Sequence, residues 1–412
     1  MHKKDKMKIM ILSSLYGARG GGSGVVAQHI AKGLSDVGHQ VSVITIGETH
    51  RASWSVEQGM KIYRFMPVNL YPFKEKDTHP AWQRVIWQLV DVYNFHSAAM
   101  LRQILVKESP DIIHINKMRG FSGAVWSVAS DMYPGRVVQT CHDYESISPD
   151  GLMRGLIGKM ALNRTWPVRG YQIIRAHLSS RVSVVTAPSK FTLKRIIDSG
   201  LFASAQAKVI PNTHGWSDHE LKSIHSTTCR PSDGKIRFLY IGRLESEKGI
   251  RELCEAFLQL SKSHPSIELD IGGWGTLDTE LRSKFGSHPN FRFLGMVSGK
   301  SKAEAFCNAT IIIVPSVVEE VFGLVTIEAF AFGKPVLASR AGGLPELVSH
   351  GNTGWLFDTG NIQALFERLE NVANADSLLL AGMSKNCRDY SYNFSLNKII
   401  NEYEGIYDQL MN

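Results

Sequence analysis

Short runs of apolar residues alternate with longer segments of helical period along the whole chain. The first apolar run covers residues 8–13, and another covers residues 41–46. A helical segment lies between them, and its apolar positions share one face: Val26, Ile30, Leu34 and Val37. Gly38 then stands where a helix commonly ends. The pattern therefore predicts a strand, a helix and a second strand at the start of the chain.

Further apolar runs continue this alternation to the carboxyl terminus. They lie at residues 111–116, 136–140, 182–187, 236–241, 267–271, 291–294, 311–314 and 335–339. Because these runs are continuous rather than alternating, they are typical of strands buried on both faces of a parallel sheet. Helical segments separate them, for example at residues 248–260, and an amphipathic helix at 394–410 ends the chain. The sequence predicts an α/β protein with helix-covered parallel sheets.

The best candidate for a linker is the polar stretch at residues 212–235, which has no hydrophobic period. It divides the chain into two doubly wound halves of similar size, residues 1–213 and 214–393. We expect the final helix, residues 394–412, to pack back on the amino-terminal half. Such a pair of halves encloses a cleft between the carboxyl ends of their strands, where folds of this class bind ligands.

The composition narrows the class of protein. Of the 412 residues, 43% are hydrophobic and 20% are charged, which excludes disordered, collagen-like and coiled-coil chains. No apolar stretch approaches the 18 residues that a membrane-spanning helix needs. The basic residues at the amino terminus are better interpreted as leading into a first strand than as part of a secretory signal. The five cysteines show no Cys-x-x-Cys spacing, which argues against a disulfide framework or a zinc site. We therefore expect a reducing compartment and a cytoplasmic protein.

The charge is unevenly divided. Residues 1–210 hold 27 Lys and Arg against 14 Asp and Glu, whereas the remainder holds 19 against 24. No nucleic-acid-binding motif accompanies the basic half, so nucleic acid is not an expected partner. Residues 151–181 contain six basic residues, no acidic ones, and interleaved apolar side chains. This segment fits an amphipathic helix on the anionic inner face of the cytoplasmic membrane, or equally an ordinary helical pair packed on its own domain.

The segment at residues 20–24, Gly-Gly-Gly-Ser-Gly, follows the first strand and precedes the first helix. Backbone N–H groups at such a turn, together with the helix dipole, attract an anion. Gly22, Gly24 and Ala27 also fit the dinucleotide fingerprint, with Glu48 as the corresponding ribose ligand. However, eight residues separate Ser13 from Gly22, which is a longer turn than that fingerprint uses. A flexible glycine turn is the alternative.

Two further groups carry candidate chemistry in the carboxyl half. Arg243 and Lys248 flank the turn after the strand at 236–241, where a bidentate guanidinium and an ammonium can converge on a phosphate, although a solvated turn is the alternative. Glu320 and Glu328 bracket an apolar stretch in which Gly323 lets backbone N–H groups approach a ligand. Carboxylates in apolar surroundings are costly unless they bind something, and they accept hydrogen bonds from sugar hydroxyls.

Together these motifs resemble the retaining glycosyltransferases of family 4, which have the GT-B fold of two Rossmann-like domains facing a central cleft. The strongest matches are Gly242-Arg243, Glu247-Lys248-Gly249, Gly272-Gly273-Trp274-Gly275, Phe293-Leu294-Gly295, Glu320-x7-Glu328-Ala329, Pro335-Val336 and Gly342-Gly343-Leu344-Pro345-Glu346. Weaker matches in the amino half are Gly21-Gly22, Gly38-His39, Pro110-Asp111, His142-Asp143, Ala187-Pro188-Ser189 and Ile210-Pro211-Asn212.

The resemblance implies a role for each matching residue. Arg243 and Lys248 would neutralise the donor diphosphate, Glu320 would hold the donor sugar, and His142 would contact that sugar near the reacting centre. Glu328 would hold the ribose hydroxyls. The remaining donor-binding positions would act mainly through their backbone: Gly21, Gly22, Gly242, Gly273, Met296, Val297, Phe322, Gly323 and Leu324. No Asp-x-Asp motif is present, and two cations already face the leaving diphosphate, so no metal is expected.

The sequence therefore predicts a retaining glycosyltransferase that moves a sugar from a nucleotide-diphosphate donor to a glycan or lipid-linked acceptor, in bacterial surface polysaccharide biosynthesis. A UDP-sugar is preferred to a GDP-sugar, and no further cofactor is expected. Three alternatives stay open. They are a sugar-nucleotide epimerase, a nicotinamide-dependent oxidoreductase, and a silent nucleotide-sugar-binding partner of a polysaccharide assembly complex.

Overall fold

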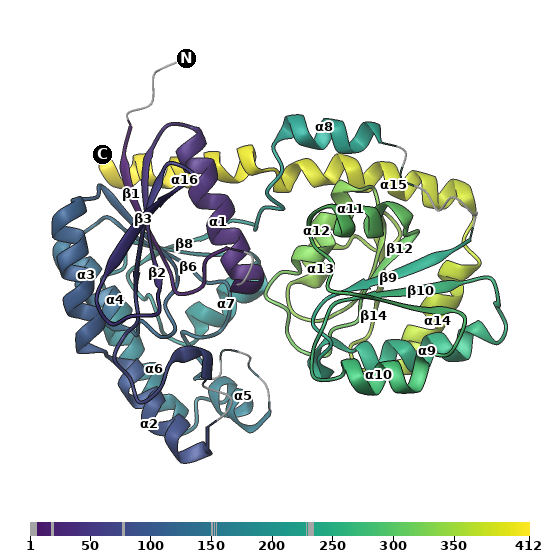
Figure 1. Cartoon of the computed structure of the whole chain (residues 1–412), viewed down its shortest axis with the longest axis horizontal. Coiled ribbons are helices and arrows are strands. Elements are labelled where there is room, and N and C mark those ends of the chain that lie inside the picture. Colours follow the sequence, from purple (N-terminus) through teal and green to yellow (C-terminus); the bar gives the residue numbers. More distant parts are fainter. Residues whose placement is uncertain are drawn as a thin grey trace. The chain divides into compact units, whose positions relative to one another are not determined.

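The computed structural model describes residues 6–17, 20–75, 79–149, 151, 153, 155–227, 229 and 235–412. The chain divides into two compact units (Figure 1). Unit 1 holds residues 1–215 and 399–412, and unit 2 holds residues 216–398.

Unit 1 is built on one sheet. Its described strands are β1 (Lys8–Ser13), β2 (Gln40–Ile46), β3 (Ser53–Glu57), β4 (Met60–Phe65), β5 (Ile112–Lys117), β6 (Val137–Thr140), β7 (Val184–Ala187) and β8 (Gln206–Val209). They lie in the order β3-β4-β2-β1-β5-β6-β7-β8, and every neighbouring pair is parallel except β3 and β4. Its described helices are α1 (Gly21–Asp36), α2 (Ala81–Val92), α3 (Phe95–Glu108), α4 (Ala124–Met132), α5 (Gly155–Leu162), α6 (Val168–Ser179) and α7 (Lys190–Asp198), with a 3-10 turn η2 (Phe73–Glu75).

Unit 2 holds a parallel sheet in the order β11-β10-β9-β12-β13-β14. Its described strands are β9 (Arg237–Ile241), β10 (Glu268–Gly272), β11 (Phe291–Gly295), β12 (Ile311–Val314), β13 (Val336–Ser339) and β14 (Gly354–Phe357). Its described helices are α8 (Asp218–Ser226), α9 (Ile250–Ser261), α10 (Asp278–Phe285), α11 (Gly299–Asn308), α12 (Leu324–Ala331), α13 (Leu344–Leu347), α14 (Ile362–Ala373) and α15 (Ser377–Ser391), with 3-10 turns η3 (Ser246–Lys248) and η4 (Tyr392–Phe394).

Alternating side chains of β9 explain why the strands of unit 2 are apolar throughout. Phe238 and Tyr240 enter one buried cluster with residues of α9, α10 and α14, whereas Leu239 enters a second cluster with residues of α11, α12 and α13. Figure 1 shows these helix groups on opposite faces of the sheet. Both faces of the strand are therefore removed from water, as continuous apolar runs predict. The expected architecture of two parallel, helix-covered sheets is confirmed.

The final helix, α16 (Leu396–Met411), has most of its length in unit 1. Its buried Tyr407 lies with the hydroxyl oxygen 2.7 Å from His114 Nδ1 on β5, and Tyr403 lies 3.2 Å from Thr140 Oγ1 on β6. The phenol side chains of α16 thus complete the hydrogen bonding of polar groups that the sheet buries.

Three local expectations differ from the structure. The boundary between the units, at residues 215–216, lies within the expected linker, but this stretch also contains α8. The helix forms because Ser217 and Glu220 make a capping box, in which each side chain accepts a hydrogen bond from the other's backbone N–H. The glycine segment is not a loop, since α1 already begins at Gly21. Val37 does not share the buried face of α1, because it follows the last helical residue and is half exposed.

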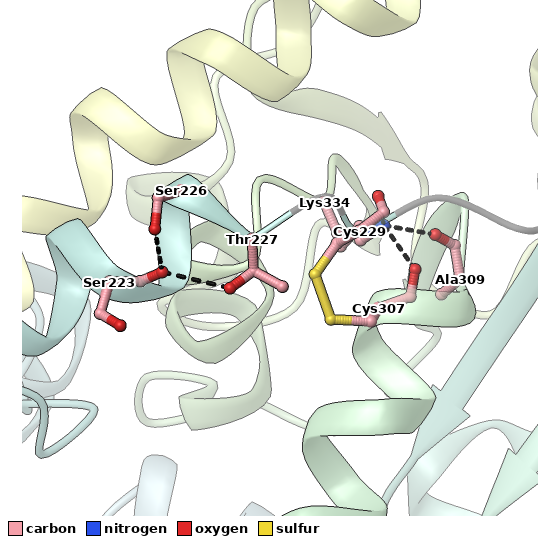
Figure 2. The surroundings of a disulfide bond; sticks show 7 residues. All are labelled: Ser223, Ser226, Thr227, Cys229, Cys307, Ala309 and Lys334. Atoms are coloured by element: carbon pink, nitrogen blue, oxygen red, sulfur yellow. Dashed lines mark hydrogen bonds between the residues drawn. A yellow bond between two sulfur atoms is a disulfide. The ribbon is translucent and has the colours of Figure 1, made fainter.

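The cysteine pattern argues against a disulfide framework, yet the structure contains one disulfide. Cys229 and Cys307, 78 positions apart, are joined (Figure 2). The buried Lys334 lies beside them and donates to the carbonyl oxygens of Cys229 (2.8 Å), Cys307 (3.1 Å) and Ala309 (2.7 Å). A pair so far apart in sequence leaves no local spacing pattern, and the cysteine count therefore no longer supports a reducing compartment.

Candidate functional site

The strongest motifs of the carboxyl half all follow strand ends. Gly242 and Arg243 follow β9, Gly273 follows β10, and Met296 follows β11. Because the strands of unit 2 are parallel, their carboxyl ends share one edge of the sheet, which is where open α/β sheets bind ligands. The segment that carries Glu320 follows β12 at the same edge.

Backbone hydrogen bonds join these turns. Gly242 N donates to Gly272 O (3.0 Å), Gly273 N to Gly295 O (2.7 Å), and Leu244 N to Trp274 O (2.9 Å). Gly273 has a φ of 143°, and a Cβ there would collide with the carbonyl oxygen of Gly242. Only glycine fits this close approach of the two backbone segments, so the contact between these turns depends on the glycine of the motif.

Lys248 and Glu320 form the central ion pair of the site. Lys248 Nζ lies 2.6 Å from Glu320 Oε1, and the side chains are 24% and 15% exposed. Ser316, a buried residue after β12, donates its hydroxyl to the same carboxylate oxygen. Burial raises the pKa of Glu320, but Lys248 and Ser316 outweigh it and hold the pKa below its usual value. Glu320 is therefore an anion at neutral pH.

Arg243 lies beside this pair. Its charge also contributes to the low pKa of Glu320. Its guanidinium Nη2 lies 3.2 Å from Glu247 Oε1 and is half exposed, while Tyr240 fixes its backbone by donating its hydroxyl to the Arg243 carbonyl oxygen (2.7 Å). The structure thus brings Arg243, Lys248 and Glu320 together, with both cations partly accessible to a ligand.

Gly323 precedes α12 as its N-cap residue and lies in the left-handed region, with a φ of 103°. A Cβ there would meet Leu344 Cδ2, so a side chain would strain both the backbone and the packing. Phe322 is buried beneath the turn, and Leu324 is the first helical residue. The free N–H groups of this first turn and the helix dipole favour an anion here, as the motif predicts.

Glu328 lies one turn further along α12 and is not joined to Glu320 or Lys248 by any contact among the described residues. Its Oε1 lies 2.6 Å from Lys302 Nζ on α11. Met296 is largely exposed after β11, and Val297 packs near Gly272. These positions border the same edge of the sheet as the central pair.

In unit 1, His142 follows β6, and its Nε2 lies 2.9 Å from Asn116 Oδ1 on β5. Burial lowers the pKa of His142 to about 4, with Lys117 adding to the effect and Asp143 opposing it. The imidazole is therefore neutral at pH 7 and suits a hydrogen bond to a sugar hydroxyl. Gly21 and Gly22 are exposed at the start of α1, within the first helical turn.

The sequence did not predict a cluster of largely buried charged residues that lies beside His142. Lys117, at the end of β5, pairs with Asp143 and lies 3.4 Å from Glu145 Oε2. Ser316 and Lys302 were missed in unit 2. None of these residues stands in a local pattern, because their partners come from other elements.

The chain consists of two linked α/β units, and glycine turns and cations lie at the carboxyl ends of the strands of unit 2. This arrangement is typical of the GT-B class of glycosyltransferases. The family model described as Glycosyltransferase Family 4 matches residues 20–213, and the model for glycosyl transferases group 1 matches residues 228–394. The chain therefore belongs to the family 4 glycosyltransferases.

Relatives and solved structures agree with this assignment. A 42.6 kDa protein from the cps region of Klebsiella pneumoniae is 29% identical over 83% of this chain and 87% of its own. The N-acetyl-alpha-D-glucosaminyl L-malate synthase of Bacillus anthracis is 24% identical over 94% and 93%. The structure of HepE from Anabaena with UDP and glucose has a TM-score of 0.69 at 21% identity, covering 98% of this chain and all of that one. The GT-B fold is thereby confirmed.

Within the described residues, no helix is both long and apolar enough to cross a membrane.

Proposed function

We propose that the chain transfers a sugar, with retention of anomeric configuration, from a nucleotide-diphosphate sugar to a glycan or lipid-linked acceptor. The observation that carries this proposal is the group of Lys248, Glu320 and Arg243 at the carboxyl ends of the unit 2 strands. Two cations and an ionised carboxylate at one edge suit a ligand that combines a diphosphate with a sugar.

Each residue of this group has a distinct task. When the glycosidic bond breaks, negative charge accumulates on the leaving diphosphate, and Arg243 and Lys248 stabilise it. Glu320 accepts hydrogen bonds from the sugar hydroxyls, and neutral His142 contributes a further one from unit 1. The departing phosphate oxygen accepts the acceptor's proton on the same face, so the protein supplies position and charge rather than a strong base. Because the two cations neutralise the diphosphate, this chemistry needs no metal ion.

The names of similar proteins support a uridine-nucleotide donor and a role in surface polysaccharide biosynthesis. HepE of Anabaena has been solved with UDP-glucose, which favours a uridine donor over a guanosine one. One relative is encoded in a cps region, and a lipopolysaccharide outer core galactosyltransferase is among the structural neighbours, with a TM-score of 0.64. We infer a role in bacterial surface polysaccharide biosynthesis on the cytoplasmic side of the membrane.

The direct test is a thermal-shift panel of UDP, ADP and GDP followed by transfer assays with the matching sugars. A ligand that binds only the folded state raises the unfolding midpoint. We expect UDP to raise it most, and NMR of the product to show the donor's anomeric configuration. Nicotinamide reduction, or donor epimerisation without transfer, would instead support the enzyme alternatives. Donor binding without turnover on any acceptor would support a silent partner.

We also propose that residues 151–181 bind an anionic membrane surface. Helix α5 exposes Leu156 and Ile157, and Trp166 after it is 77% exposed. Helix α2, which packs with α5 on the same helix α6, adds the exposed Trp82 and Leu89 (Figure 1). Large exposed apolar side chains together with basic ones are the composition that interfacial helices use.

The basic contribution is smaller than the sequence indicates. Arg175 is buried against the rings of Trp126 and Tyr171, and Arg181 pairs with Asp131. Arg154 lies outside the described residues. Among the described basic residues of the segment that have no acidic partner, Lys159 and Arg164 are exposed and Arg169 is half-buried.

A further inference from the structure

Helix α11 places a lysine against the carboxylate that we assign to the donor ribose. Lys302 Nζ lies 2.6 Å from Glu328 Oε1, and the two side chains are 29% and 17% exposed. Lys302 is the one partner that Glu328 has among the described residues. The contact joins two helices that follow different strands, α11 after β11 and α12 after β12.

The partial burial of this pair distinguishes it from an ordinary surface ion pair. Lys302 Nζ also lies 6.0 Å from the centroid of the Phe306 ring, one turn further along α11, so its ammonium group lies near an aromatic ring as well as the carboxylate. Lys300, on the same helix, is 92% exposed, and its Nζ lies 3.8 Å from Glu304 Oε1. An exposed pair of that kind has little effect on structure, whereas the part-buried one restricts both side chains.

We propose that Lys302 is a positioning residue: it holds the Glu328 carboxylate in the orientation in which it can receive the two ribose hydroxyls of the donor. This inference rests on the proposed function. An ionised carboxylate accepts hydrogen bonds at about four lone-pair sites. Lys302 engages Oε1 from the α11 side, which leaves Oε2 and the outer lone pair of Oε1 for the hydroxyls.

The expected effect follows from preorganisation. Without Lys302, the Glu328 side chain must be ordered when the nucleotide binds, and its charge loses the cation that compensates for partial burial. Ordering one flexible side chain and weakening its hydrogen bonds reduces affinity about three- to tenfold. The reduction is confined to ligands that carry ribose hydroxyls, because Lys302 acts through Glu328 and not on the diphosphate.

The test compares the dissociation constants of UDP and 2′,3′-dideoxy-UDP by calorimetry on the full chain. Lys302→Met removes the ammonium group but keeps a long unbranched side chain, and Lys300→Met is the matched control on the same helix. We expect Lys302→Met to weaken UDP about three- to tenfold while leaving dideoxy-UDP unchanged, and Lys300→Met to change neither. Lys302→Arg should recover most of the loss. In a Glu328→Gln background, Lys302→Met should have no further effect on UDP binding.

Two results would overturn the inference. Equal weakening of UDP and dideoxy-UDP by Lys302→Met would show a general effect on the fold or on the diphosphate. Additive losses in the double variant would show that Lys302 does not act through Glu328. The proposed function fails separately, if the wild-type chain binds none of UDP, ADP and GDP. If ADP or GDP binds instead of UDP, the same comparison is made with that base and its dideoxy form.

Discussion

At the scale of single residues, ion pairs within the candidate site hold its charged side chains in place. In the structure Lys248 engages Glu320, and Arg243 engages Glu247, so each cation already has an anionic partner. A donor diphosphate adds negative charge beside these cations, and a donor sugar brings hydroxyls to Glu320. Because the side chains are fixed before the donor arrives, little reorganisation is needed as charge develops on the leaving group.

Lys248→Ala should lower kcat about 10²- to 10³-fold, which is the typical cost of removing one preorganised electrostatic donor. The donor KM should change far less, because the charge on the diphosphate grows as the bond breaks. Steady-state kinetics on the purified variant with the identified donor measures both constants. A wild-type kcat in Lys248→Ala would show that the leaving group is stabilised by other residues.

Arg243→Lys tests the geometry of the second cation. An ammonium keeps the charge but loses the two parallel N–H donors of a guanidinium. We expect kcat to remain well below that of the wild type, between the values for Arg243→Ala and the unchanged chain. Full activity in Arg243→Lys would mean that only the charge matters. The same kinetic assay distinguishes these results, with Arg251→Lys, at an exposed surface pair with Glu280, as the control.

His114 should make unit 1 less stable in acid. Burial lowers the pKa of His114 to about 3, and its ring nitrogens contact only the neutral hydroxyls of Tyr407 and Thr140. Below the ordinary histidine pKa of about 6.5, the unfolded chain binds a proton that the folded chain does not, so stability falls as the pH decreases. From pH 7 to pH 5 this amounts to about 2 kcal/mol.

The measurement is urea unfolding of the wild type and His114→Gln at pH 7 and pH 5. Glutamine keeps hydrogen-bonding groups but does not titrate. We expect His114→Gln to be less stable at pH 7, because the contacts of a buried ring are lost, yet to lose about 2 kcal/mol less than the wild type on acidification. Identical pH dependence in both chains would contradict the assigned protonation of His114.

At the scale of elements, the sequence predicts most of the strands that the two sheets bury, although the buried strands β4 and β14 were not predicted. The apolar runs locate β1, β5 and β12 to within one residue, because strands buried on both faces must be apolar throughout. The edge strands β3 and β8 were not predicted, because their side chains are mostly exposed or half-buried and form no apolar run.

The residues of the candidate site also fall into those that the sequence predicts and those that it does not. Turn glycines and the residues after strand ends can be read from the sequence, because they are fixed by local backbone geometry. The Glu320 segment was found through its glycine and its two carboxylates. Ser316 and Lys302 could not be found, since a contact between α11 and α12, or between the end of β12 and a downstream loop, depends on how the elements pack.

The exposed faces of α5 and α2 should bind anionic vesicles. Each basic side chain near such a surface contributes about 1 kcal/mol, and the large exposed Trp and Leu side chains add burial in the interface. Lys159→Glu combined with Arg169→Glu should therefore release the protein from vesicles of phosphatidylglycerol and phosphatidylcholine. Vesicle sedimentation measures the bound fraction, and added salt should reduce it for the wild type.

The matched control for this variant carries the same charge change elsewhere. Lys194→Glu combined with Lys300→Glu alters two exposed lysines on other helices, and it should sediment with vesicles almost as the wild type does. Turnover on a soluble acceptor should be unaffected in both variants. Equal release of the two double variants would mean that net charge, not this surface, governs binding, and no release from either would discard the membrane surface.

At the scale of the whole molecule, the assigned residues are divided between two units. In the proposed function, unit 2 would supply the cations and carboxylates for the donor, and unit 1 would supply His142 and the glycines at the start of α1. The chain passes between the units twice, at residues 215–216 and 398–399. A reaction that uses both sets of residues around one donor therefore needs both units to contact that donor.

Donor binding should reduce the radius of gyration of the chain. Two units connected by a pair of chain crossings can rotate as rigid bodies, and a ligand that contacts both favours the closed arrangement in proportion to its differential affinity for that state. Small-angle scattering without ligand, with UDP and with the intact nucleotide sugar measures the change. The intact donor should have the largest effect, because its sugar is the part that His142 contacts. His142→Ala should bind UDP normally and yet respond less to the intact donor. If calorimetry shows saturation and the radius stays constant, closure is not how the two sets of residues meet, and the role of His142 would have to be withdrawn.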